Sequence, residues 1–94
     1  MPSFLARVEL HSATYRDYEV LHASMNRRGF GRTIKSGDGR TFQLPTGTYV
    51  VEGTTSSLAN ALNAANDAAN ETGKKSWVLV AEWSSATWLN LPVV

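Results

Sequence analysis

The chain has 94 residues and no cysteine, with nine basic and eight acidic side chains. This length fits one domain, residues 1–94, and the lack of cysteine excludes a disulfide framework, a thiolate zinc site and a cysteine nucleophile. A net charge of +1 also lacks the strongly basic balance that is typical of nucleic-acid-binding proteins.

The N-terminal stretch MPSFLARVEL has no basic segment followed by a long apolar run, so we expect no signal peptide. The longest apolar run, residues 77–81, is too short to span a bilayer. We therefore expect a soluble cytoplasmic protein with no membrane partner.

Residues 3–11 alternate between apolar and other side chains, which predicts a strand with one buried face, made of Phe4, Ala6, Val8 and Leu10. A helix is predicted next, over residues 15–28. Thr14 and Asp17 form a near capping-box pattern at its start, and Gly29 is placed to end it as a C′ glycine. The apolar positions of this helix recur at helical spacing: Tyr15, Tyr18, Leu21 and Met25.

Residues 30–35 predict a second strand, and the Gly-Asp-Gly sequence at 37–39 predicts a tight turn. Residues 40–44 then return as a strand or an extended arm, and Pro45 interrupts them, which suits the edge of a sheet. Residues 47–54 predict a central strand.

A second helix is predicted over residues 58–72, capped by Ser56 or Ser57 and ended by Gly73. Its expected apolar face consists of Leu58, Ala61, Leu62, Ala65, Ala68 and Ala69. Residues 75–82 predict a last strand, with Trp77, Leu79 and Ala81 on one face. The C-terminal tail predicts a short extra strand, which in one arrangement pairs with another subunit.

The predicted element order is β-α-β-β-α-β. Two interleaved right-handed β-α-β units form an α+β fold of the ferredoxin-like type, a four-stranded antiparallel sheet with both helices on one face. The other face of such a sheet is bare. Small proteins of this kind cover it by dimerising, so we expect a homodimer.

The chain has two histidines, His11 at the end of the first strand and His22 in the first helix, and histidine is the side-chain type best suited to acid–base chemistry near neutral pH. His22 lies roughly 12 Å along its helix, at about 1.5 Å per residue. We therefore expect no acid–base pair between the two histidines within one chain. The carboxylates are spread singly along the sequence and no phosphate-loop motif is present, so we expect neither a metal nor a cofactor.

A cluster of basic side chains lies at residues 27–40, with Asp38 the one acid among them. Its members are Arg27, Arg28, Arg32, Lys35 and Arg40. Arginine binds phosphate groups bidentately, so the cluster is a candidate RNA-binding edge. The alternative is that these cations only favour a helix end and keep an edge strand soluble.

Three stretches of the chain carry a family resemblance: RVELH at 7–11, DYxxLHxxMxxRGFxRTI at 17–34 and DGxxxQLPTGxYxxEG at 38–53. With TGKK at 72–75, they resemble a family of small bacterial and phage-borne domains that is grouped with the GhoS antitoxin of type V toxin–antitoxin systems. The resemblance implies a ferredoxin-like fold similar to the CRISPR-associated Cas2 nucleases. It also implies sequence-specific cleavage of a messenger RNA.

His22 stands where the named antitoxin has an arginine implicated in cleavage, and His11 stands where Cas2-like enzymes have a metal-binding aspartate. Histidine catalyses acid–base steps on RNA without metal. The expected function is therefore a metal-independent endoribonuclease, with His22 and His11 as the catalytic candidates. The alternative is a non-catalytic homodimer that binds a protein partner through its sheet face and the tail with Trp83 and Trp88.

Overall fold

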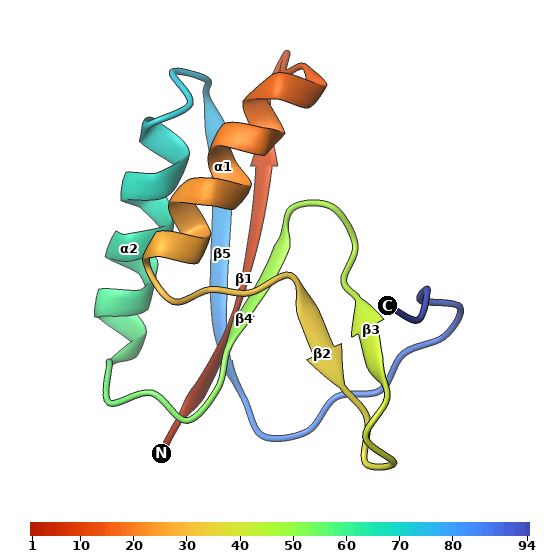
Figure 1. Cartoon of the computed structure of the whole chain (residues 1–94). Helices are drawn as coiled ribbons and strands as arrows, with labels where there is room; N and C mark the ends of the chain where they lie inside the picture. The colour runs from red at the N-terminus through yellow and green to blue at the C-terminus, as the bar shows by residue number, and fades with distance from the viewer.

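The computed structural model describes all residues, 1–94, and shows an α+β protein. Its elements in chain order are β1 (Ser3–Leu10), α1 (Tyr15–Arg27), β2 (Thr33–Lys35), β3 (Thr41–Gln43), β4 (Thr48–Val51), α2 (Leu58–Asn70) and β5 (Ser76–Trp83). Three of the strands form one antiparallel sheet in the order β4-β1-β5, and β2 and β3 form a separate hairpin. Figure 1 shows both helices on one side of the larger sheet and the hairpin beside β4. Neither helix is long and apolar enough to cross a membrane.

The prediction of one four-stranded sheet is wrong, because the second predicted strand divides into two parts. At its start, Gly31 pairs with Val50 of β4 through two backbone hydrogen bonds of 2.8 and 2.9 Å. From Thr33 onward the chain leaves β4 and pairs with β3 instead. This departure buries Ile34 and Phe42 against Val50 in a second small core, which a continuous flat sheet would leave exposed.

The main core lies between the larger sheet and the two helices. It contains the predicted buried face of β1, together with Tyr49 of β4 and Leu21 and Met25 of α1. Four alanines of α2 complete this core: Ala61, Ala65, Ala68 and Ala69. Their short side chains let α2 lie close to the sheet, which stabilises a helix that is rich in asparagine and weak by propensity.

The predicted ends of α1 are confirmed in detail. Thr14 and Asp17 form a full capping box, since each side chain bonds the backbone N–H of the other. At the other end, Phe30 N–H bonds the carbonyl of Met25 at 3.0 Å and Gly29 has φ +89°. This is the Schellman motif that the glycine predicted, and it fixes where the chain turns from α1 toward the candidate site.

Two predicted helix faces are partly wrong. Tyr15 was expected to be buried under α1 but is 81% exposed. On α2, Leu58 and Leu62 are 48% and 43% exposed, although they share the apolar stripe with the alanines. The reason is the width of the contact: because α2 sits close to the sheet on its alanines, the leucines at one flank of the stripe extend past the covered surface.

The C-terminal tail packs within the chain, and the predicted short strand is reduced to a single bridge between Val93 and Phe42. Backbone bonds of 2.9 Å, from Gln43 N–H to Pro92 and from Val94 N–H to Thr41, fasten the tail along β3. Trp88 packs against Phe42 with ring centres 5.3 Å apart. The tail therefore covers the outer edge of the hairpin, as the dark blue segment in Figure 1 shows.

Candidate functional site

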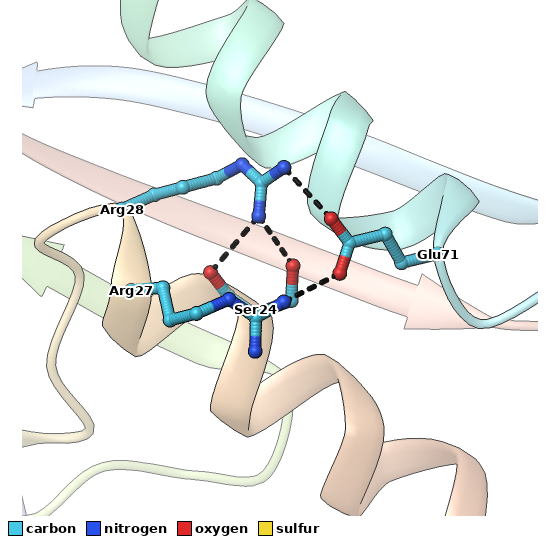
Figure 2. A network of polar contacts seen from close by, with 4 residues as sticks. All are labelled: Ser24, Arg27, Arg28 and Glu71. Carbon is cyan, nitrogen blue, oxygen red and sulfur yellow. Dashed lines mark hydrogen bonds and ion pairs between the residues drawn. The ribbon is translucent and has the colours of Figure 1, made fainter.

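The predicted basic cluster divides into groups with different surroundings. At the end of α1, Arg27 and Arg28 each bond a different oxygen of Glu71, at 2.7 and 2.8 Å. Glu71 follows the last residue of α2, so the two arginines tie the ends of the helices together (Figure 2). The single carboxylate offsets one of the two positive charges, and both guanidinium groups are held in place by it.

Arg28 also holds a buried group inside this network. Its guanidinium donates to the hydroxyl of Ser24 at 2.5 Å and to the Ser24 carbonyl at 3.2 Å. Ser24 is fully buried, so its hydroxyl needs this partner. The hydroxyl of Ser24 and the guanidinium of Arg28 hold the pKa of the Glu71 carboxyl below its ordinary value. We conclude that Arg27 and Arg28 stabilise the helix pair.

Lys35 and Arg40 lie on the hairpin, away from the helix ends. Arg40 bonds Asp38 at 2.9 Å and lies 5.3 Å from the centre of the Phe42 ring. Both cations line an open depression of about 870 Å³ between the hairpin and the tail, which Glu52 and Glu82 also line. The depression is thus mixed in charge and gives no concentrated positive field.

Arg32 lies apart from both groups. It lies just before β2 and lines a depression of about 400 Å³ with His22 and Glu19 of α1. The floor of this depression includes Phe30 and Gly31, the residues that follow the end of α1. No ion pair of the structure includes Arg32. Its guanidinium is therefore a cation without a partner, half-buried beside a histidine.

His22 is positioned by the sheet beneath it. Its Nδ1 lies 2.6 Å from the hydroxyl oxygen of Tyr49, whose side chain is fully buried. Burial and the charge of Arg32 lower the pKa of His22, while Glu19 partly offsets them. Burial also raises the pKa of the Tyr49 phenol, which therefore stays protonated. At neutral pH the imidazole is consequently uncharged and can accept a proton.

The contact with Tyr49 engages Nδ1 of His22 and leaves Nε2 free of this hydrogen bond. The donor and acceptor roles in this hydrogen bond depend on the imidazole tautomer. When Nδ1 carries the proton and donates to the oxygen of Tyr49, Nε2 keeps its lone pair. That tautomer gives a general base held in one orientation, about one helical turn from Glu19 and in the same depression as Arg32.

His11, the second catalytic candidate, lies in a different place. Its ring packs edge-on against Trp77 with ring centres 4.6 Å apart, and its Nε2 is 3.8 Å from Glu9. It borders a separate depression with Lys74 and Lys75. The structure thus brings His22 together with Arg32, as part of the predicted set, and does not bring His11 to them.

Two residues of this site were missed from the sequence. Glu19 stands three positions before His22 on α1, so helical spacing alone could have placed them side by side. Tyr49 gave no such signal, because it is 27 positions from His22 and meets it only through the packing of α1 on β4. The site holds no group of three or more metal-ligating side chains.

Comparison with known proteins adds no relative to this picture. No family model, no curated protein and no solved structure matches the chain. The function is therefore argued from the geometry around His22 and Arg32.

Proposed function

We propose that the protein binds RNA and cleaves it without metal, as an endoribonuclease of the antitoxin type that the sequence resembles. The observation that carries the proposal is the uncharged His22, held by Tyr49 at 2.6 Å beside the unpaired Arg32. A neutral imidazole can remove the proton of an RNA 2′-hydroxyl, and a guanidinium in the same depression can stabilise the phosphoryl oxygens.

The reaction follows from these positions. Nε2 of His22 takes the proton of the 2′-hydroxyl, whose oxygen attacks the neighbouring phosphorus and expels the 5′-oxygen. Arg32 stabilises the negative charge that grows on the phosphoryl oxygens, and the open depression admits water to protonate the leaving 5′-oxygen. The products are a 2′,3′-cyclic phosphate and a 5′-hydroxyl.

The fold supports the same family. The order β4-β1-β5, extended past β4 by the bridge from Gly31 to Val50, follows the strand order of a ferredoxin-like sheet. We propose this fold type for the chain, with the β2–β3 hairpin as an addition to it. An RNA substrate of this kind is found in the cytoplasm, where we expect the protein to act.

The test is incubation of the purified protein with a mixed pool of end-labelled RNAs, with and without EDTA. We expect discrete cleavage that resists EDTA and leaves cyclic phosphate ends. His22→Ala should reduce the rate about 100- to 10,000-fold, the usual contribution of a general base. Intact RNA under every condition, or unchanged cleavage by His22→Ala, would contradict the proposal.

Two further variants locate the effect at this site. Tyr49→Phe keeps the buried ring and removes the hydroxyl that orients His22, so we expect the rate to fall about tenfold, equivalent to about 1.4 kcal/mol. His11→Ala is the matched control, since it removes the other histidine from a separate depression. It should leave cleavage unchanged, and a loss there as large as that of His22→Ala would move the chemistry to His11.

The alternative, a non-catalytic partner-binding module, placed the contact on the sheet face and on the tail with Trp83 and Trp88. Trp88 packs on Phe42, and both Trp83 and Trp88 lie half-buried against the hairpin core. These indoles are therefore partly engaged within the chain, which makes the tail a less suitable docking surface for a protein partner.

A further inference from the structure

One face of the larger sheet remains half uncovered. The hairpin and tail cover its lower part, around Leu5 and Val50. Above them, Trp77 and Leu79 of β5 are 68% and 63% exposed, opposite Glu9 and Arg7 of β1. Large apolar side chains side by side on a strand are uncommon on the surface of a monomer and mark an interaction site.

β5 also has a free edge. It lies at the end of the sheet order, with β1 on one side and no strand on the other. The N–H of His11 donates a hydrogen bond to the carbonyl of Lys75, so these two residues form a hydrogen-bonded pair of the ladder between β1 and β5. Hydrogen-bonded and non-hydrogen-bonded pairs then alternate along β5. By that alternation, the backbone groups of Ser76, Val78, Val80 and Glu82 point outward.

This edge lacks the usual protection against pairing. Edge strands are kept apart by charged residues, prolines or bulges, but residues 76–81 read SWVLVA and contain none of them. Of the other strand edges, β4 pairs with Gly31 at Val50 and the tail lies along β3, while the three-residue β2 pairs only with β3. Within this chain, β5 is thus an eight-residue strand with an apolar, unblocked edge.

Helix α2 extends the same surface beyond the sheet. Leu58, Leu62 and Asn66 are four positions apart and therefore lie along one side of α2. Asn66 borders a depression with Ser76 and Trp77 of β5. Glu71 marks the opposite side of α2, which faces α1. The two exposed leucines therefore lie on the side of α2 next to the free edge of β5.

We propose that a second copy of the chain occupies this edge, with β5 paired antiparallel to the partner's β5 around a two-fold axis. The proposed register pairs Leu79 with its own copy and Val78 with the copy of Val80. The strand overlaps from Ser76 to Glu82, and Trp77 faces the small copy of Ala81. The proposal does not depend on RNA cleavage.

The edge is complementary to itself in charge and in shape. Glu82, the one charged residue of β5, faces the copy of Ser76 and lies diagonal to the copy of Lys74, so no like charges meet. Paired strands lie about 4.8 Å apart, so two copies of α2, each over β1 and β5, come within a helix-packing distance of about 10 Å. That approach buries Leu58 and Leu62, whose exposure the monomer leaves unexplained.

The register gives a specific crosslinking test, because the chain has no cysteine of its own. Leu79 and its copy form a non-hydrogen-bonded pair with Cα atoms about 4.5 Å apart, within the range that a disulfide spans. Leu79→Cys should therefore form a disulfide dimer under mild oxidation. Ala81→Cys should not, since its copy lies about four residues away along the strand.

Leu89→Cys is the matched control, because Leu89 is 83% exposed but lies in the tail. Disulfide formation by this variant reports random collision between two chains. Crosslinking of the Leu89 or Ala81 variant as readily as the Leu79 variant would overturn the proposal, as would no crosslinking at Leu79.

Sedimentation of the unmodified chain gives an independent readout. We expect a monomer–dimer equilibrium that depends on concentration, and Leu79→Arg should weaken it at least about tenfold by placing two cations face to face. Leu89→Arg should leave it unchanged. A monomer at every concentration, or a dimer that tolerates Leu79→Arg, would overturn the proposal.

Discussion

Arg27 and Arg28, before Gly29, have different surroundings from Arg32, after it, although the sequence presents the three as one cluster. Before the glycine, Arg27 and Arg28 share the carboxylate of Glu71 across the helix pair (Figure 2). After it, Arg32 has no acidic partner and lies beside His22. A charge that is already paired contributes to stability, whereas an unpaired charge in a depression is available to a ligand.

The largest effect that should separate Arg32 from Arg27 and Arg28 is on the rate of RNA cleavage. Arg32→Ala removes the charge that stabilises the phosphoryl oxygens, so the cleavage rate should fall about 100-fold, and Arg32→Lys should restore part of it. Arg28→Ala should leave the rate essentially unchanged. The measurement is the single-turnover rate on the RNA identified from the pool.

RNA binding gives the control for that experiment. The slope of log K for binding against log salt concentration reflects the number of phosphate contacts. Loss of one contact should make this slope less steep by about 0.7 for single-stranded RNA in Arg32→Ala, but not in Arg27→Ala or Arg28→Ala. Equal losses from all three arginines would mean that the pairing with Glu71 does not separate them.

The features that the sequence predicted depend on residues close together in the chain, whereas the features that it missed depend on residues far apart. Thr14, Asp17 and Gly29 were placed correctly because capping bonds join residues at most five positions apart. The pairing of Arg28 with Glu71 joins residues 43 positions apart and arises only when the helices pack on the sheet. No local pattern in the sequence distinguishes a paired arginine from a free one.

The hairpin itself was predicted, with its turn at 37–39, but its departure from β4 was missed for a related reason. Alternating side chains predicted a strand over residues 30–35, and propensity alone would continue it along β4. Folding back buries Ile34 and Phe42 on the outer face of the sheet, and this gain depends on Val50 and Leu5, which belong to other elements. The sequence therefore predicted that the sheet face away from the helices is bare throughout. In the structure the part around Leu5 and Val50 is covered, and the part around Trp77 and Leu79 is bare.

The effect on stability is smaller, and it reverses the roles of Arg28 and Arg32. Arg28→Ala removes the guanidinium that donates to the buried hydroxyl of Ser24 and to Glu71, which should cost about 1–2 kcal/mol of unfolding free energy. For a domain of this size, that corresponds to a fall in Tm of about 4–8 °C per kcal/mol. Arg32→Ala should change Tm little.

Arg27→Ala is the matched control for that measurement, since its side chain is 61% exposed and its ion pair with Glu71 is screened by solvent. Thermal unfolding followed by circular dichroism would rank the variants. A fall in Tm for Arg32→Ala as large as that for Arg28→Ala would show that Arg32 also stabilises the fold.

The smallest predicted effect is a dependence of stability on pH that comes from His22. Burial and the charge of Arg32 hold its folded pKa below the ordinary 6.5, so the unfolded chain binds a proton more readily than the folded one. The free energy of unfolding should then be highest above pH 6.5 and fall as pH drops below it, with a slope below that of one proton.

Two variants connect this slope to the depression. His22→Gln removes the titrating group and should flatten the profile between pH 5 and 7. Arg32→Gln removes only the second of the two causes, so its slope should lie between those of the wild type and His22→Gln. Urea unfolding at several pH values measures the three profiles. If Arg32→Gln keeps the full slope, burial alone lowers the pKa of His22, and the guanidinium is too distant to act with the imidazole on one phosphate.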